Sequence, residues 1–220
     1  FTASNVAISF ALLGKKAVIV GLDIRKPRLA ELFEINDHHH GITPLLTKDH
    51  NTWQEIAEQI VNSGINKNLD LLMAGPIPPN PAELMARQSL DDIISQLREH
   101  YDYILIDTAP VGLVSDTLQV SRIANATVYL CRADYTPKSS FELINSLNKE
   151  KKMPKMSIVL NGVDLSKKKY GYYYGYGKYG KYGRYGQYGA YKSYGSSVYG
   201  SYGNYSNSHY GDKNDNSVKR

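Results

Sequence analysis

Two continuous apolar runs, each ending in an acid, constrain the possible folds of this chain more than any other feature. They are AVIVGLD at residues 17–23 and YDYILIDTAP at residues 101–110. A run without period-two alternation is apolar on both faces, which is typical of a parallel strand covered by helices on each side. We therefore expect the carboxylates of Asp23 and Asp107 at one edge of a sheet, where parallel strands have their carboxyl ends.

Three further runs complete the expected sheet and alternate with helical patterns. Asn80 and Pro81 form a recognised helix start signal, a cap followed by proline in the first position. The alternation predicts a doubly wound α/β fold, that is, a mostly parallel sheet with helices on both faces. The further strands are expected at 68–75, 126–133 and 156–163, and the helices at 3–13, 80–99, 114–124 and 138–152.

The chain changes character near Ser166, where the apolar periodicity ends. Residues 167–220 contain ten Lys or Arg and two Asp or Glu, a balance of +8, and the total of +5 leaves −3 for residues 1–166. We therefore expect a mildly acidic globular domain at 1–166 and a basic tail rich in Tyr and Gly at 167–220. Frequent glycine and scarce aliphatic residues predict that this tail is disordered.

Tyrosines recur in the tail at a spacing of three, which fits neither an amphipathic helix nor a half-buried strand. Fifteen of them fall between Tyr170 and Tyr210. Two interpretations are open: they are phosphoacceptors of a kinase, or they belong to a low-complexity segment that binds single-stranded nucleic acid or itself. The evenly spaced set is Tyr176, Tyr179, Tyr182, Tyr185, Tyr188, Tyr191 and Tyr194.

Simpler features of the sequence argue against a disulfide-stabilised protein, a membrane span and a histidine metal site. Cys131 is the one cysteine and lies in an apolar run, so the sequence predicts a buried strand thiol and excludes a disulfide framework. No apolar run approaches the roughly 18 residues of a membrane span, and no signal peptide pattern occurs. The three histidines at 38–40 lack helical metal-ligand spacing and are interpreted as part of a solvated loop.

Asp23 and Asp107 together predict a divalent-cation site, because Mg²⁺ prefers hard oxygen ligands and keeps several waters. The segment ILIDTAP has the form of a Walker B element, a hydrophobic strand followed by Asp. Arg25, Lys26 and Arg28 stand close to the same predicted edge. They could neutralise phosphate, form a subunit contact or belong to a solvated loop.

Several segments in a fixed order resemble the cytoplasmic domain of the bacterial tyrosine kinases, which are P-loop kinases linked to capsule and exopolysaccharide polymerisation. The resemblance covers nearly all of residues 1–166, and a C-terminal tyrosine cluster is the other hallmark of that family. It implies a P-loop NTPase-like fold, ATP and Mg²⁺ as cofactors, and transfer of the ATP γ-phosphate to the tail tyrosines. The segments are VIVGLDIRKPRL, NPAELM, YDYILIDTAPVGLVSDTLQV and VLNGVD.

The resemblance also implies roles for single residues. Asp23 matches the second acid of the family's extra Walker motif and Asp107 matches the Walker B acid, so both are the implied catalytic and metal-binding residues. Asn161 resembles the position that meets the adenine ring, although an ordinary turn explains the segment NGVD equally well. Arg25 is grouped with Asn161 as cofactor-binding. Asp116 is interpreted as a helix cap and is left out of the catalytic set.

Two departures from the family pattern affect the predicted chemistry. Gly21 stands where the family has an acid thought to help accept the tyrosine proton, and Asp23 could serve both roles because phosphoryl transfer depends mainly on positioning and charge neutralisation. No G-x-x-x-x-G-K-[ST] loop occurs in the chain. Truncation just after that loop and a pseudo-enzyme are the two explanations, and under either one these 220 residues are expected to bind ATP poorly.

The resemblance further implies partners and a location. The expected partners are other copies of the chain in a suspected ring, the tail of the same or a neighbouring subunit, a polysaccharide co-polymerase membrane region in the same or another chain, and a protein-tyrosine phosphatase. No nucleic acid is expected, and the expected location is the cytoplasmic face of the bacterial inner membrane. The alternatives are a partition-type ATPase, which would leave the tail unexplained, and a catalytically inactive regulatory module with a sticky tail.

Overall fold

The computed structural model describes residues 1–37 and 39–164. These residues belong to two compact units, Phe1–Ala124 and a second unit that begins at Asn125. The predicted boundary near Ser166 and the predicted tail lie outside the described residues. The division into a domain at 1–166 and a tail therefore stays a prediction.

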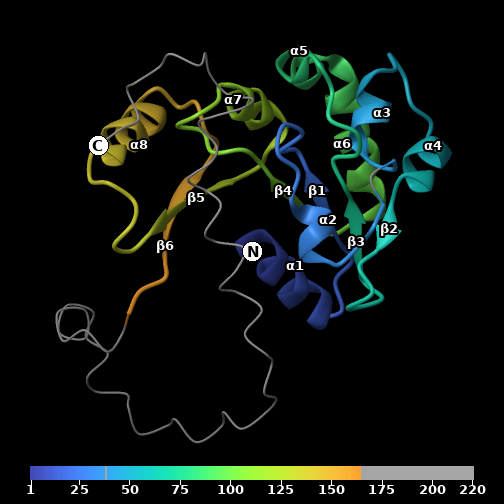
Figure 1. Cartoon of the computed structure of the whole chain (residues 1–220), viewed down its shortest axis with the longest axis horizontal. Coiled ribbons are helices and arrows are strands. Elements are labelled where there is room, and N and C mark those ends of the chain that lie inside the picture. The colour runs from blue at the N-terminus through green and yellow to red at the C-terminus, as the bar shows by residue number, and fades with distance from the viewer. Residues whose placement is uncertain (38, 165–220) are drawn as a thin grey trace, which may run out of the picture. The chain divides into compact units, whose positions relative to one another are not determined.

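A four-stranded sheet forms the centre of the first unit (Figure 1). The strands are ordered β2–β3–β1–β4, and β1 pairs in parallel with both β3 and β4, while β2 pairs antiparallel with β3. The mostly parallel sheet confirms the predicted fold class. The bounds of the strands are Ala17–Gly21 for β1, Val61–Asn62 for β2, Leu69–Leu72 for β3 and Tyr103–Asp107 for β4.

Helices cover both faces of this sheet, which explains why β1 is apolar throughout. Val18 and Val20 pack in a cluster with α3, α5 and α6, whereas Ala17 and Ile19 pack in a second cluster with α1 and α2. All five residues of β1 are buried, as a strand covered on both faces requires. The helices are α1 (Thr2–Leu12), α2 (Leu29–Leu32), α3 (Ile42–Leu46), α5 (Pro81–Ala86) and α6 (Gln88–His100).

The helix predicted at 80–99 is two helices, α5 and α6. Pro81 begins α5 as predicted, but Arg87 after its last turn is extended, with φ −71° and ψ 150°. The Arg87 carbonyl oxygen accepts a hydrogen bond of 3.0 Å from Nη2 of Arg122. The same oxygen accepts a hydrogen bond of 3.3 Å from the amide of Leu90 in the first turn of α6, so the backbone at the break is held by both a helix and a side chain.

The buried face of α1 consists of small residues. Ser4, Ala7 and Ala11 are buried there, while the larger Val6 and Leu13 are exposed. Small side chains let this helix lie close to the sheet, and Phe10 stacks on Tyr103 of β4 with ring centroids 3.8 Å apart.

A short helix, α4 (Trp53–Glu58), follows a capping box formed by Thr52 and Glu55. Its first residue, Trp53, stacks on the ring of His100 at the end of α6, with ring centroids 3.6 Å apart and an interplanar angle of 13°. This stack joins two helices of the first unit.

The chain comes unusually close to itself beyond the carboxyl end of β3. The amides of Ile42 and Thr43 donate hydrogen bonds to the carbonyl oxygens of Met73 and Ala74, at 2.8 and 3.0 Å. A Cβ atom added to Gly41, whose φ is +155°, would lie 2.3 Å from the backbone nitrogen of Gly75. Gly41 is therefore required by the close approach of two backbone segments.

After β4, the first unit ends with α7 (Asp116–Val120) and a short 3₁₀ helix, η1 (Ser121–Ile123). In the second unit, β5 (Thr127–Arg132) pairs in parallel with β6 (Met156–Asn161), and α8 (Ser140–Lys149) connects them. Cys131 is buried in β5, as predicted, and burial raises the pKa of its thiol. Over residues 1–37 and 39–164, no helix has the length and apolar character needed to span a bilayer.

Candidate active site

Asp23 and Asp107 lie at the carboxyl ends of neighbouring parallel strands. Gly21, the last residue of β1, pairs with Asp107, the last residue of β4. The amide of Leu22 donates a hydrogen bond of 2.7 Å to the carbonyl oxygen of Asp107, and Asp23 follows directly. The two acids thus stand at the same edge of the sheet, while their roles in catalysis and metal binding stay predictions.

The two carboxylates also interact electrostatically. Burial raises the pKa of Asp107, and the negative charge of Asp23 raises it further. A divalent cation beside both acids would neutralise this concentrated negative charge. The donor chemistry of the pair therefore fits Mg²⁺.

The number of acids fits the same ion. In the part of the chain that the structure describes, no group of three or more His, Cys, Asp or Glu residues could hold a metal. Magnesium commonly uses one or two carboxylates and completes its shell with water and phosphate oxygens.

Two side chains anchor the loop that carries Asp23. The amide of Lys26 donates a hydrogen bond of 3.0 Å to Oδ1 of Asp23, which closes a tight turn. Nε of Arg25 donates a hydrogen bond of 2.6 Å to Oδ2 of Asp116 in an ion pair. The predicted cofactor role of Arg25 stays a prediction, and the structure shows its guanidinium held by an acid.

Asp116 is the residue of this region that sequence reasoning missed. It is the first residue of α7, whose cap position is Ser115, and its carboxylate contacts Arg25. The interpretation of Asp116 as a helix cap is therefore wrong. Its partner is 91 residues away in the chain, so no local pattern could have indicated the pair.

Gly21 occupies a closely packed position. A Cβ atom there would lie 3.2 Å from the backbone nitrogen of Ala74 and 3.4 Å from Cδ2 of Leu29. The acid that the family carries at this position would therefore need its neighbours to shift in this chain. Among the three positions Gly21, Asp23 and Asp107, only the last two supply carboxylates to this edge.

The other predicted site residues are not brought to this edge by the described first unit. Asn161 ends β6 in the second unit, where its side-chain oxygen accepts a hydrogen bond of 2.8 Å from the amide of Gly162. Its predicted adenine contact stays a prediction. The phosphoacceptor tyrosines lie outside the described residues. In the histidine run, Nδ1 of His40 lies 2.6 Å from Oδ2 of Asp37.

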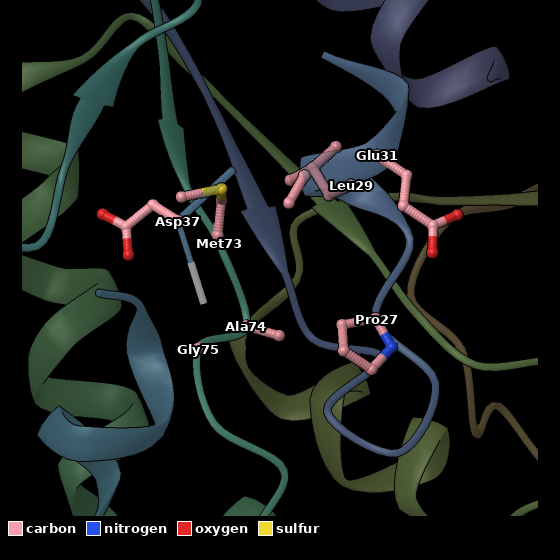
Figure 2. A pocket seen from close by; sticks show the side chains of 8 residues that line it. Pro27, Leu29, Glu31, Asp37, Met73, Ala74 and Gly75 are labelled. Atoms are coloured by element: carbon pink, nitrogen blue, oxygen red, sulfur yellow. The ribbon is translucent and has the colours of Figure 1, made fainter. Parts of the chain in front are cut away.

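A small cavity of about 50 Å³ lies next to this edge (Figure 2). Pro27, Leu29 and Glu31 line it from the segment after β1, and Met73 and Gly75 line it from the segment after β3. It has room for about one or two water molecules. Neither catalytic candidate lines it, so it is not the predicted nucleotide site.

Comparison with solved structures first identifies the class of fold. The septum site-determining protein MinD from Pyrococcus horikoshii, solved in complex with Mg-ADP, matches with a TM-score of 0.57. The match covers 72% of this chain and 62% of that one, and at 17% sequence identity it shows the fold alone. That fold is the one shared by P-loop NTPases.

Closer matches identify the family. Tyrosine-protein kinase YwqD of Bacillus subtilis is 32% identical over 173 residues, which are 78% of this chain and 70% of YwqD. The kinase domain of the Escherichia coli tyrosine kinase ETK matches with a TM-score of 0.63 and 27% identity, over 74% of this chain and 62% of that one. The chimerical protein CapA2B2 matches with a TM-score of 0.62 and 30% identity, over 72% and 67%.

The chain belongs to the family of bacterial tyrosine-protein kinases. No family model matches it.

Proposed function

We propose that this protein transfers the γ-phosphate of ATP to tyrosines of its own C-terminal segment, with Asp23 and Asp107 as ligands of Mg²⁺. One observation carries the proposal: two buried or half-buried acids meet at the ends of adjacent parallel strands in a member of a tyrosine kinase family. Parallel α/β sheets bind their ligands outside the carboxyl ends of the strands, which is where these acids lie.

Magnesium, when bound, supplies charge neutralisation for the phosphates during transfer. Asp107 and Asp23 hold it from two strands. Phe10, near the end of α1, stacks on Tyr103 at the start of β4, so the start of α1 lies toward the carboxyl edge of the sheet. A helix amino terminus favours anions, which supports a position for the nucleotide phosphates at the start of α1. Asp23 also accepts the tyrosine proton, because Gly21 has no side chain to do so.

The tail suits the role of substrate. A tethered segment reaches an active site, its own or that of a neighbouring subunit, at high effective concentration. Each phosphate adds about −1.5 to −2 charges near neutral pH, so roughly four to six of them offset the tail's balance of +8. This change of sign loosens the oligomer by releasing the tail from acidic surfaces.

The resemblance to kinases linked to capsule and exopolysaccharide polymerisation supports a place in the same process. There the protein works as a homo-oligomer at the cytoplasmic face of the membrane, together with a polysaccharide co-polymerase. A protein-tyrosine phosphatase reverses the modification.

The test is phosphotyrosine mapping by mass spectrometry on protein made from its complete coding sequence in its native cell. Phosphate is expected on the set from Tyr176 to Tyr194. Asp107→Asn and Asp23→Asn are each expected to lower the rate of tyrosine phosphorylation about a hundredfold or more, since metal-based stabilisation of the transition state contributes several kcal/mol.

Asp102→Asn is the matched control, because Asp102 stands just before the amino end of β4 and its carboxylate accepts a 2.9 Å hydrogen bond from the amide of Lys16. The rate of tyrosine phosphorylation in Asp102→Asn is expected to stay within about twofold of that of the unmodified protein, as for surface substitutions away from a functional site. Full activity in Asp23→Asn and Asp107→Asn would contradict the proposal. ATP hydrolysis without phosphotyrosine would indicate a partition-type ATPase instead.

A further inference from the structure

A largely buried ion pair connects the two chain segments that carry Asp23 and Asp107. Nε of Arg25 lies 2.6 Å from Oδ2 of Asp116, and the two side chains are 20% and 9% exposed. Arg25 follows Asp23 by two residues, and Asp116 follows Asp107 on the segment that leaves β4. The pair therefore bridges the two loops at the edge where the acids meet.

Each partner of the pair lies on a segment that a hydrogen bond holds close to one of the two acids. On one side, the amide of Lys26, next to Arg25, donates to the carboxylate of Asp23 at 3.0 Å. Pro27 follows and fixes the backbone where this loop turns toward α2 (Figure 2). The turn at 23–26 therefore moves as one piece with Arg25.

On the other side, α7 is tied to the segment directly after β4. The hydroxyl of Thr117 donates a hydrogen bond of 2.7 Å to the carbonyl oxygen of Ala109, two residues after Asp107. The amide of Val114 donates a bond of 3.2 Å to the carbonyl oxygen of Pro110. Asp116 is therefore held at a fixed place relative to Asp107.

Another arginine–aspartate pair in the same unit provides a contrast. Arg122 Nε lies 3.0 Å from Asp91 Oδ2, with side chains 31% and 27% exposed, and it joins η1 to α6, neither of which carries a candidate metal ligand. Both pairs join distant parts of the chain. Only the Arg25–Asp116 pair ends on a loop that carries a candidate metal ligand.

We propose that Asp116 is a positioning residue, which holds Arg25 and with it the turn at 23–26, so that Asp23 stands beside Asp107 at one metal ion. The proposal rests on the function proposed above. Asp116 acts through Arg25, whose Nε binds Oδ2 of its carboxylate. Buried partners of metal ligands commonly have such an orienting role.

The experiment measures binding of Mn²⁺ alone, as a paramagnetic probe of the magnesium site, by electron paramagnetic resonance on the full-length protein. Asp116→Asn is expected to weaken Mn²⁺ binding by about tenfold or more, the usual range for a lost orienting partner. Asp91→Asn is the matched control and is expected to leave binding unchanged. Asp116→Glu keeps the charge and is expected to restore part of the affinity.

Hydrogen exchange supplies a second readout, which does not depend on metal or activity. The amide of Lys26, bonded to Asp23, is expected to exchange faster in Asp116→Asn and at the original rate in Asp91→Asn. If Asp116→Asn does not fold, Arg25→Lys replaces it, because lysine keeps the charge but lacks the planar guanidinium that fits a carboxylate.

The outcomes separate the two proposals. Mn²⁺ binding in the unmodified protein that Asp116→Asn leaves unchanged overturns the positioning role alone. An equal loss in Asp91→Asn also overturns it, because the effect would then be general destabilisation. If the unmodified protein binds no Mn²⁺, the proposed metal site fails and the positioning role fails with it.

Discussion

Acidic side chains have different surroundings at the two edges of the four-stranded sheet. At the amino edge, Asp70 accepts hydrogen bonds from the hydroxyl of Tyr101 at 2.9 Å and from Nδ2 of Asn62 at 3.0 Å. At the carboxyl edge, the pKa of Asp107 is raised because the carboxyl group is buried and lies near the negative charge of Asp23. The acid at the amino edge is thus bonded to two neutral side chains, whereas Asp107 at the carboxyl edge is buried beside a second acid, Asp23.

Glycines show the same contrast. Near the amino edge, Gly14 and Gly64 have no atom within 4 Å of the place where a Cβ would stand. At the carboxyl edge, Gly41 and Gly21 have backbone atoms at 2.3 and 3.2 Å from that place. Close packing and two neighbouring acids, Asp23 and Asp107, occur together at the edge where we place the function, as expected where stability is sacrificed for activity.

The largest expected effect on stability is at the closest approach of the two backbones. Gly41→Ala forces the backbones of residues 41 and 75 apart and is expected to lower the free energy of unfolding by about 3 kcal/mol or more. Urea denaturation measures the loss. Gly64→Ala, with φ of +71° and open space, is the control and is expected to lose about 1 kcal/mol from backbone strain alone. Equal losses would show that both edges are packed alike.

A smaller effect is expected at the amino edge. Asp70→Ala removes the partner of a half-buried tyrosine hydroxyl and is expected to cost about 1–3 kcal/mol in the free energy of unfolding. Burial, followed by the charge of Asp70, raises the pKa of Tyr101, which shows how far this hydroxyl is withdrawn from water. A double-mutant cycle with Tyr101→Phe measures the coupling, and strictly additive losses would mean that the hydrogen bond contributes nothing.

At Gly21 the neighbours must move by only a few tenths of an ångström. Gly21→Ala is therefore expected to cost about 1 kcal/mol, the lower end of the range for an added methyl group in a packed region. Thermal unfolding measures it. Gly21→Asp is expected to destabilise at least as much and not to raise the phosphorylation rate. A rate above that of the unmodified protein would show that the missing acid limits catalysis.

The smallest expected effect is a gain in stability. The pKa of Asp107 in the folded chain lies above its ordinary value of 3.8, so the folded state holds the proton more tightly than the unfolded chain does. Stability is then highest below that ordinary value and falls as pH rises through the window up to the folded-state pKa. Asp107→Asn removes the charge and is expected to raise the melting temperature by a few degrees at neutral pH.

The gain in Asp107→Asn is expected to vanish in acid, below pH 3.8, where the unmodified side chain is neutral in both states. Melting curves across that range check the sign. A variant that is less stable than the unmodified protein at neutral pH would mean that the carboxylate is satisfied by protein groups, as at the amino edge.

The sequence predicted the parts of the fold that are long and uniformly apolar. β1 and β4 were recognisable because a strand buried on both faces has no polar alternation, and their final acids marked the carboxyl edge. The division of the helix at 80–99 was missed because Arg87 is extended without any proline or glycine at the break. β2 was missed because two residues, Val61–Asn62, carry no readable period.

The candidate site was predictable only in part. Asp23 and Asp107 follow from strand ends, but their assignment to catalysis and metal binding came from the family resemblance. The ion pair of Asp116 could not be predicted from the sequence, because its partner Arg25 lies far away in the chain. An acid just before a helix is also usually interpreted as a cap. Contacts of this kind depend on how loops meet in three dimensions.

Because Trp53 stacks on His100, tryptophan fluorescence reports on the contact between α4 and α6. Trp53 is the single tryptophan of the protein, and both rings belong to the first unit. Separation of the rings alters the surroundings of the indole, so tryptophan emission follows loosening of α4 from α6. Because Trp53 belongs to the first unit, a difference between emission and circular dichroism melting curves would show that the two units unfold separately.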